Sequence, residues 1–486
     1  MTGDHQDSAV MLARHMTTGG DARIVLGTSG LNRYFSAPHP RDVIAFASST
    51  ANDVSVDGFA HAARWLAANA PSGAMDPTGY AAALDALRVR LRAAYGVSDT
   101  TEVVFAPSGT DLEYVALAAM LGRRPGGVHN ILLGSDEVGS GCIHSAAGRF
   151  FAQETALDLA VQPGEPVLGL ASHVTLSDVA VRDADGGARD SARMTAAIAL
   201  EAEAAIARGE AVLVHVVHGS KTGLVLPSLD DIDALAARFG DAIGFVVDAC
   251  QARITSAAIA AYLDRGCILF LTGSKFMGGP PFSGFALLPA GTAAAAAPLP
   301  ADFARIFRRA EWPRDWAGAA ALPDSANLGL LLRLDVSLYE LERFQALDMI
   351  DVAHVIGRFW AAASALAIRI GARMVTPGDP ASDALGGADQ TLAMRTLVTL
   401  DLSATPGAPD FDEATRLHRA LLRHGIRLGQ PVRCVRLPDG RWGATLRIGL
   451  SMPQVVALAA LGETERGRRL DADMDAIGTA LIAELV

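Results

Sequence analysis

The sequence contains very little lysine. Lysine and arginine together make up 41 of the 486 residues, and only two of these, Lys221 and Lys275, are lysines. Arginine cannot replace an amine that must lose its proton and attack a carbonyl, because the guanidinium group stays protonated. A lysine in such a chain is therefore a candidate for covalent chemistry. The alternative, a solvated surface lysine, is weaker for Lys275, which lies between an apolar run and a Gly/Pro-rich loop, than for Lys221.

The sequence also lacks the marks of several protein classes. Its four cysteines show no paired metal-ligand spacing and no disulfide pattern, which suits a reducing cytoplasm and predicts no metal site. A net charge of -12 argues against nucleic acid or an anionic membrane as the main partner. There is no apolar run of about 18 residues, and the N-terminus lacks the basic start and apolar run of a signal peptide. We therefore expect a cytoplasmic protein.

The length predicts more than one domain. A chain of 486 residues is too long for one ordinary hydrophobic core. Residues 1–45 are rich in turns and predict an N-terminal arm that lies on another surface, as is usual for a dimer with sites at the subunit boundary. Residues 46–335 predict a large domain, and residues 336–486 predict a smaller C-terminal α+β domain.

Apolar runs alternate with helical segments through the large domain. This cadence predicts an α/β fold with a mostly parallel sheet covered by helices, in which ligands bind at the carboxyl ends of the strands. The turn before residue 111 also leads into a helix, so its N–H groups predict a phosphate site, with tight packing as the alternative. We expect five loops of polar and small residues to meet at one edge of the sheet: Ser108–Thr110, Asp136–Ser140, His218–Thr222, Asp248–Gln251 and Thr272–Lys275.

Two of these loops carry a carboxylate and an amine. The apolar run Gly244–Val247 ends at Asp248, and the run Ile268–Leu271 leads to Lys275. An amine can form a Schiff base with pyridoxal phosphate, and a carboxylate can keep the pyridine nitrogen protonated so that the ring accepts electrons. The pairing therefore indicates a pyridoxal phosphate enzyme.

Motifs between about residue 46 and residue 460 resemble, in matching order, the class V aminotransferase and cysteine desulfurase family of fold-type I pyridoxal phosphate enzymes. The motifs are FASSTANDVS, PSGTDLEYVAL, VVHGSKTGLVLPSLDDIDALAARFG, VDACQ, LTGSKFMGGPPFSGF and LRIGLS. The resemblance implies the fold of that family and a small-molecule, amino acid-like substrate. It also implies a homodimer with shared sites, in which the loop with Ser325 and Asn327 reaches the phosphate of the partner subunit.

The resemblance implies roles for single residues as well. Lys275 would form the Schiff base and carry the α-proton as general base and acid. Asp248 would pair with the pyridinium nitrogen, and Gln251 would bond to the ring hydroxyl. The phosphate would be held by Ser108, Gly109, Thr110, Thr272 and Ser274. The substrate would be bound by Arg447, which would grip its carboxylate, and by Ser220, Lys221 and His218.

The chain departs from the family pattern at several of these positions. The segment Asp136-Glu137-Val138 stands where the family often has a histidine that stacks on the ring, and Ser274 stands where many members have a histidine before the lysine. Ser220-Lys221 replaces an Asn-Glu pair, and an inward-pointing Lys221 would indicate an anionic group on the substrate. His218 as a structural histidine and Arg447 as a surface arginine remain alternatives.

The two cysteines near the predicted site, Cys142 and Cys250, do not lie on the segment that corresponds to the family's sulfur-accepting loop. An aminotransferase acting on a small amino acid is the first hypothesis. A lyase or decarboxylase would use the same cofactor to break another bond, and a noncatalytic cofactor-binding protein is the weakest alternative.

Overall fold

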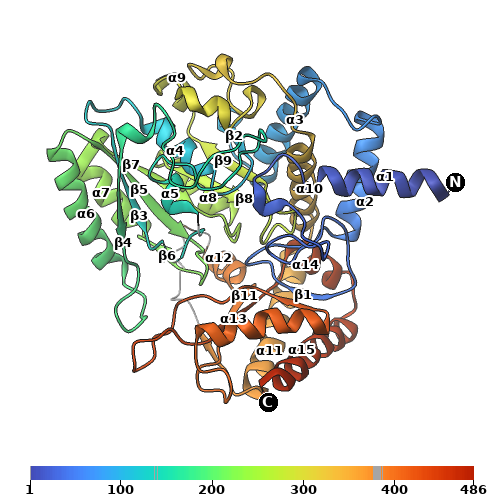
Figure 1. The fold of residues 1–486 in the computed structure, drawn as a ribbon. Coiled ribbons are helices and arrows are strands. Elements are labelled where there is room, and N and C mark those ends of the chain that lie inside the picture. The colour runs from blue at the N-terminus through green and yellow to red at the C-terminus, as the bar shows by residue number, and fades with distance from the viewer. Residues whose placement is uncertain (1, 136, 140, 376–384, 386, 486) are drawn as a thin grey trace.

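The structure is a computed structural model that describes residues 2–135, 137–139, 141–375, 385 and 387–485, with side chains described from residue 9 onward (Figure 1). Its main element is an eight-stranded sheet with the order β2-β9-β8-β7-β5-β3-β4, and β6 pairs with β5. Neighbours from β8 to β4 run parallel, whereas β9 is antiparallel to both β8 and β2. The strands are β2 (Glu102–Ala106), β3 (Val128–Leu133), β4 (Val174–Val179), β5 (Ala211–His218), β6 (Val225–Leu226), β7 (Ile243–Asp248), β8 (Ile268–Thr272) and β9 (Gly284–Leu288).

Helices cover both faces of this sheet because its central strands are apolar on both sides. All residues of β5 are buried. Val212, Val214 and Val216 pack in one core with α6 (Ser191–Ala207), α7 (Leu229–Phe239) and α8 (Ser256–Leu263). Ala211 and Leu213 point the other way, into a second core with α4 (Leu112–Met120). The predicted fold class, a mostly parallel helix-covered sheet, is confirmed.

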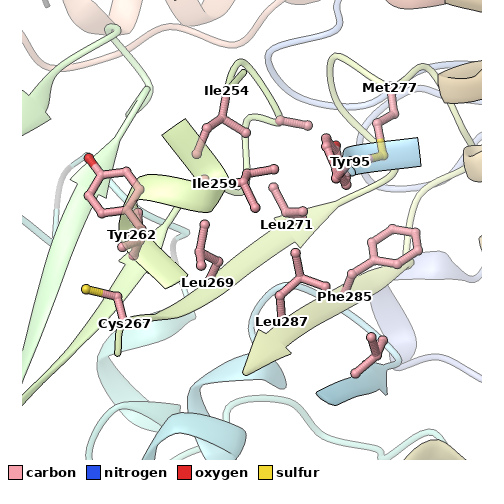
Figure 2. Packing of buried hydrophobic residues seen from close by; sticks show 14 of the residues in the cluster. Tyr95, Ile254, Ile259, Tyr262, Cys267, Leu269, Leu271, Met277, Phe285 and Leu287 are labelled. Carbon is pink, nitrogen blue, oxygen red and sulfur yellow. The ribbon is translucent and has the colours of Figure 1, made fainter. Parts of the chain in front are cut away.

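The first core continues under β8 and β9 (Figure 2). Leu269 and Leu271 alternate with residues of the opposite face and pack beside Ile259 and Tyr262 of α8. A layer of mostly apolar side chains on this face of the sheet therefore supports the ends of β7 and β8.

Several helices begin at side-chain caps that the sequence provides. Ser55 accepts from the N–H of Gly58 at the start of α2, and Asp76 accepts from the N–H of Gly79 at the start of α3, where Pro77 is the first residue. The remaining α-helices are α1 (Thr2–His15), α2 (Val56–Asn69), α3 (Pro77–Tyr95), α5 (Cys142–Ser145), α9 (Thr292–Ala295), α10 (Leu328–Gln345), α11 (Met349–Arg369), α12 (Gly387–Met394), α13 (Phe411–Ala420), α14 (Met452–Ala459) and α15 (Glu463–Leu485).

The C-terminal part has a sheet and a core of its own. Strand β11 (Leu397–Asp401) pairs antiparallel with β10 (Arg373–Val375) and β13 (Thr445–Gly449). Helices α11 and α13 pack on this sheet, and α14 and α15 pack against α11 in the same core (Figure 1). Strand β1 (Ile44–Phe46) pairs in parallel with β12 (Ile426–Leu428) in a separate two-stranded sheet, and α10 runs unbroken through residue 335. The division of the chain at residues 45 and 335 stays a prediction.

Among the described helices, α11 is the only one long and apolar enough to cross a membrane. Core helices of soluble proteins pass the same test. In this structure Val355, Phe359 and Ala363 of α11 are buried in the core of the C-terminal part. Helix α11 therefore packs on this core with part of its surface, and its length and composition alone are weak evidence for a membrane span.

Candidate active site

The five predicted loops meet at one cavity of about 220 Å³ at the carboxyl ends of the strands. Asp136 and Ser140, which belong to the second of these loops, lie outside the described residues. The residues that the loops contribute to the cavity wall are Ser108, Gly109, Thr110, Glu137, Val138, Gly139, Gly219, Ser220, Lys221, Asp248, Cys250, Gln251, Thr272, Ser274 and Lys275.

Asp248 is the last residue of β7, and Lys275 lies three residues after the end of the adjacent parallel strand β8. The side-chain amide of Asn52 donates to the backbone carbonyls of Ser274 and Lys275, at 2.9 and 2.6 Å, and so fixes the turn that carries the lysine. Asp248 Oδ1 accepts from the N–H of Cys250 at 2.9 Å, which orients its carboxylate. The amine and the carboxylate therefore enter the same cavity from rigid strand ends.

Gln251 lines the cavity next to Asp248, with its amide held from two sides. Its Oε1 accepts from Arg253 Nη1 at 2.9 Å, and its Nε2 donates to the Ser49 carbonyl at 3.2 Å. Arg253 is itself buried and also donates to Ser48 Oγ at 2.8 Å. The amide thus has a fixed orientation toward the cavity.

The turn at Ser108–Thr110 forms one end of the cavity, directly before α4. Ser108 Oγ accepts from the N–H of Thr110 at 3.2 Å and donates to Asp111 Oδ2 at 2.6 Å. A Cβ added to Gly109 would lie 2.8 Å from Thr272 Cγ2, so the backbone of the turn lies against the opposite wall. Thr272 Oγ1 donates to the Cys250 carbonyl at 2.7 Å, which joins this end of the cavity to the Asp248 loop.

Arg447, on β13, lies at the other end of the cavity and is only 2% exposed. Its guanidinium donates to the carbonyls of Gln430 at 2.8 Å and Ser49 at 3.3 Å, and to Thr50 Oγ1 at 3.2 Å. Burial lowers the pKa of Arg447 to about 10, although the charge of Glu137 opposes this shift. Arg447 is therefore a buried cation of the cavity wall, and the surface alternative is wrong.

Lys221 and Ser220 line the cavity beside Arg447. Burial, together with the charge of Arg447, lowers the pKa of Lys221 to about 8. Ser220 Oγ donates to the buried carboxylate of Glu137 at 2.7 Å, and Arg182 forms an ion pair with the same carboxylate at 2.7 Å. The hydroxyl hydrogen of Ser220 is thus already used in the hydrogen bond to Glu137.

His218 does not line the cavity. It is fully buried with its ring edge-on to Tyr262 of α8, and its Nδ1 lies 3.1 Å from the Tyr262 hydroxyl. Successive residues of a strand point to opposite faces. Val217 pairs with Asp248, so His218 points to the far side of the sheet. The structure supports the structural alternative for this histidine.

One cavity residue, Arg23, had no signal in the sequence. It belongs to the segment after α1, and its guanidinium donates to Ser108 Oγ at 3.2 Å and to Thr110 Oγ1 at 3.3 Å. Asp21 holds it in an ion pair at 2.6 Å. Because its position depends on contacts distant in sequence, no local pattern marks it.

Both cysteines near the site are neutral thiols. Burial raises the pKa of Cys142 and of Cys250 well above the ordinary value, and nearby carboxylates add to the shift. Only the thiolate is an effective nucleophile. Both cysteines line the cavity, Cys142 from the first residue of α5 and Cys250 from the loop after β7.

Asn327, in the loop expected to reach a partner subunit, has contacts within its own chain. Its Oδ1 accepts from the N–H of Leu330 at 3.0 Å, and its Nδ2 donates to the Gly19 carbonyl at 2.9 Å. It therefore caps α10 and holds the segment after α1. The role of Ser325 and Asn327 toward a partner stays a prediction.

Comparison with known proteins identifies the fold. No protein-family model and no curated protein matches the chain. Among solved structures, it is similar to the cysteine desulfurase CsdA from Escherichia coli, with 15% identity, a TM-score of 0.53 and coverage of 91% of this chain and 94% of that one. It is also similar to a NifS-like protein, with 11% identity, a TM-score of 0.52 and coverage of 90% and 100%. The corresponding values for ureidoglycine-glyoxylate aminotransferase from Bacillus subtilis are 12%, 0.51, 92% and 93%. At these identities the likeness shows the fold, and the chain has the fold of the fold-type I pyridoxal phosphate enzymes that include the class V aminotransferases and cysteine desulfurases.

Proposed function

We propose that the chain is a pyridoxal phosphate-dependent enzyme, an aminotransferase that acts on an amino acid or a related amine. The observation that carries the proposal is that Asp248, at the end of β7, and Lys275, in the turn after the neighbouring parallel strand β8, line one cavity with Arg447. We further propose that the enzyme is cytoplasmic, which the four free cysteines suit, and that it is a homodimer, as the resemblance of its motifs implies.

The residues of the cavity fit pyridoxal phosphate. The turn at Ser108–Thr110 offers hydroxyls and the N-terminal side of α4 to a phosphate, and its backbone can come close because Gly109 has no Cβ. Gln251 and Asp248 line the same cavity as this turn and Lys275. Bound pyridoxal phosphate supplies a carbonyl that condenses with amines and a ring that accepts an electron pair.

Three residues of the chain would carry out the main steps of the reaction. The Nζ of Lys275 is the amine that would hold the cofactor and then move the proton between the substrate Cα and the cofactor carbon. The carboxylate of Asp248 would hold a proton on the ring nitrogen, and this positive charge would draw electrons from the reacting bond. The guanidinium of Arg447 would bind the substrate carboxylate in its fork.

Arg447 also supports an aminotransferase over a decarboxylase. A carboxylate held by a buried guanidinium is stabilised as an anion, so the bond to it is not the one that breaks. The Cα–H bond remains for cleavage by Lys275. A cysteine-based sulfur transfer has less support, because Cys142 and Cys250 are neutral thiols with raised pKa values.

A second cavity supports an anionic group on the substrate. It measures about 300 Å³ and shares Gly139, Lys221 and Pro431 with the first cavity, and Arg433 lines its wall. A substrate bound at Arg447 would extend its side chain past Lys221 into this space. The positive charges of Lys221 and Arg433 along this path favour a substrate with an acidic side chain.

The experiment is reductive trapping followed by an amino acid screen. The purified protein should take up pyridoxal phosphate and turn yellow, and borohydride should fix the cofactor on Lys275, as located by peptide mass spectrometry. Lys275→Ala should abolish the adduct, whereas Lys221→Ala should retain it. A colourless protein that takes up no cofactor would overturn the proposal.

The screen then separates the reactions. An aminotransferase converts the cofactor to its amine form with the right amino acid and recovers the original spectrum when a keto acid is added. A lyase would release pyruvate or ammonia, and a decarboxylase would release carbon dioxide. Either result would replace the aminotransferase reaction while leaving the cofactor proposal intact.

A further inference from the structure

The guanidinium of Arg23 is built into the phosphate end of the cavity. Its described contacts use four of the five N–H donors of an arginine: two to Asp21, at 2.6 and 2.8 Å, and two longer ones to Ser108 and Thr110, at 3.2 and 3.3 Å. Asp21 thus fixes the orientation of the Arg23 guanidinium, and the other edge of the guanidinium faces the turn at Ser108–Thr110. The Arg23 side chain is 16% exposed.

Two aromatic rings hold the guanidinium from its faces. Its carbon lies 5.0 Å from the ring centre of Phe151 and 5.2 Å from that of Phe282. Phe282 has a φ of 70°, a left-handed backbone that a bulky residue adopts only when its surroundings impose it. Strained residues of this kind cluster at ligand sites, and the ring of this one lies beside Arg23.

The chain before Arg23 is anchored to α10. Arg333, which is fully buried, donates to the Thr18 and Gly19 carbonyls at 2.6 and 3.0 Å, and to the Phe282 carbonyl at 2.8 Å. One side chain therefore joins the segment after α1 to the loop that carries Phe282. Gly19 has a φ of +65°, and a Cβ there would lie 1.9 Å from Asn327 Oδ1, so the close approach needs glycine.

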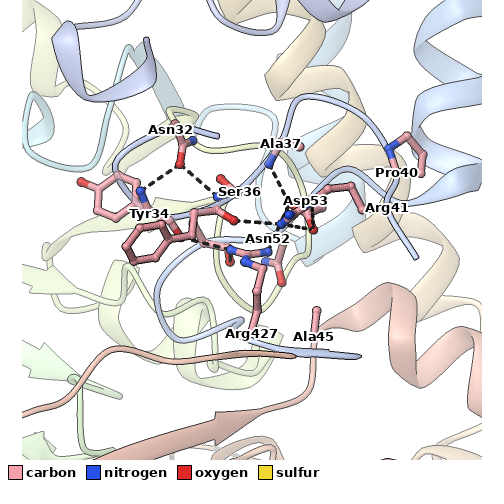
Figure 3. Close-up of polar contacts among 12 residues, drawn as sticks. Asn32, Tyr34, Ser36, Ala37, Pro40, Arg41, Ala45, Asn52, Asp53 and Arg427 are labelled. Carbon is pink, nitrogen blue, oxygen red and sulfur yellow. Dashed lines mark hydrogen bonds and ion pairs between the residues drawn. The ribbon is translucent and has the colours of Figure 1, made fainter. Parts of the chain in front are cut away.

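The chain after Arg23 is anchored through Asp53 and Arg427 (Figure 3). Asp53 accepts from the Ala37 N–H at 2.7 Å and forms ion pairs with Arg41 at 2.9 Å and Arg427 at 3.2 Å. Arg427 also donates to the Tyr34 carbonyl at 3.2 Å. The segment that carries Arg23 is thus fixed to its own chain at both ends.

A phosphate at this turn needs a cation beside it. Among the described residues that line the cavity, the cationic side chains are those of Arg23, Lys221, Lys275 and Arg447. Arg23 is the one whose hydrogen bonds go to Ser108 and Thr110, and the residue before Lys275 is a serine, which brings no charge. A phosphomonoester carries close to two negative charges at neutral pH.

We infer that Arg23 binds the phosphomonoester of the cofactor within its own subunit, so that the N-terminal segment supplies the positive charge of the phosphate pocket. The inference rests on the proposed pyridoxal phosphate site. The guanidinium keeps Asp21 on one edge and exchanges its two long hydroxyl contacts for phosphate oxygens, while Ser108 and Thr110 can turn toward the same oxygens.

The test compares two aldehydes that differ only in the phosphate. Apo protein is titrated with pyridoxal phosphate and with pyridoxal, and binding is followed by absorbance for the wild type, Arg23→Met, Arg23→Lys and Arg33→Met. Arg33 is an exposed arginine on the same segment and serves as the matched control. Thermal melting of each apo protein checks that it is folded.

We expect Arg23→Met to weaken pyridoxal phosphate binding by roughly tenfold to a hundredfold, the range of a lost charge-assisted hydrogen bond. Pyridoxal binding should be unchanged, Arg23→Lys should recover part of the loss, and Arg33→Met should bind like the wild type. Inorganic phosphate should compete with pyridoxal phosphate on the wild type and compete less on Arg23→Met.

Two results would overturn the inference while leaving the proposed function standing. One is an Arg23→Met protein that binds pyridoxal phosphate as tightly as the wild type, and the other is an equal loss for both aldehydes, which would make Arg23 a structural residue only. If Arg23→Met does not fold, Arg23→Gln, which keeps donors without the charge, gives the same comparison. A wild type that binds neither aldehyde overturns the proposed function, and the inference falls with it.

Discussion

Glu113 of α4 and His215 of β5 lie 3.1 Å apart, Oε2 to Nε2, in the core beside Asp248. Burial raises the pKa of Glu113 well above its ordinary value, and the charge of Asp248 adds to this shift. Burial lowers the pKa of His215 to about 4. Burial therefore favours the uncharged form of both side chains in this pair.

Glu113→Gln should stabilise the apo protein increasingly as the pH rises. The raised pKa means that the folded protein holds a proton that the unfolded chain loses above about pH 4.5, so the wild type loses up to about 1.4 kcal/mol of stability per pH unit above that point. Glutamine stays neutral and removes this loss. Urea unfolding between pH 5 and pH 8 measures the effect. Glu203→Gln, at an exposed position, is the control, and a difference from wild type that does not change with pH would contradict the expectation.

Gly109→Ala should impair cofactor uptake. The new methyl group would meet Thr272 Cγ2 at 2.8 Å, and either the turn or the Thr272 wall must move. Overpacking of this kind costs about 1–3 kcal/mol. Gly357→Ala is the control, because nothing lies within 4 Å of its new methyl group on α11, and it should stabilise the protein slightly. Spectroscopic titration with pyridoxal phosphate and thermal melting together measure both effects. Unchanged uptake by Gly109→Ala would show that the turn does not hold the cofactor.

Arg447→Met should weaken substrates that carry an α-carboxylate. A charge-assisted pair contributes about 1.5–3 kcal/mol, which corresponds to a rise in KM of roughly tenfold to a hundredfold. An amine without the carboxylate should bind equally well to both proteins, which separates lost recognition from general damage. Arg373→Met, at an exposed position on the same sheet, should behave like the wild type. An equal loss for both substrates would assign Arg447 to structure alone.

Binding of an acidic amino acid should weaken as the pH rises through about 8. The pKa of Lys221 is lowered to about 8 by burial, so its positive charge is present below this pH and lost above it. The same shift gives the apo protein stability that increases from about pH 8 to pH 10.5, where the unfolded chain still binds the proton. Kd values measured from pH 6.5 to pH 9.5 for wild type and Lys221→Met test this. A wild-type profile that matches Lys221→Met would exclude Lys221 from substrate binding.

The sequence was sufficient to predict the edge of the sheet where the site lies. Each loop of the site follows a buried strand, and parallel strands bring their carboxyl ends to one edge, so Lys275 and Asp248 could be placed together without coordinates. The same logic placed Ser108–Thr110 at a helix start. Order along the chain was enough because each of these residues is adjacent to the strand that positions it.

The positions of the His218 and Arg23 side chains could not be predicted in this way. His218 also follows the pattern of a strand end, but a shift of one residue along β5 turns a side chain to the opposite face, and the strand's register with β7 is needed to choose. Arg23 depends on Arg333 and Asn327, more than 300 residues away in sequence, and nothing near residue 23 signals these contacts.

The anchors of the N-terminal segment also set the order in which the site is completed. Synthesis proceeds from the N-terminus, so Arg23 is made early. The residues that hold its segment in place are made much later. Arg427, which holds the Tyr34 carbonyl, is 393 residues further on. The end of the cavity that contains Arg23 can therefore close only when almost the whole polypeptide has been made. On the proposed function, capture of the cofactor is accordingly one of the last steps in the maturation of this protein.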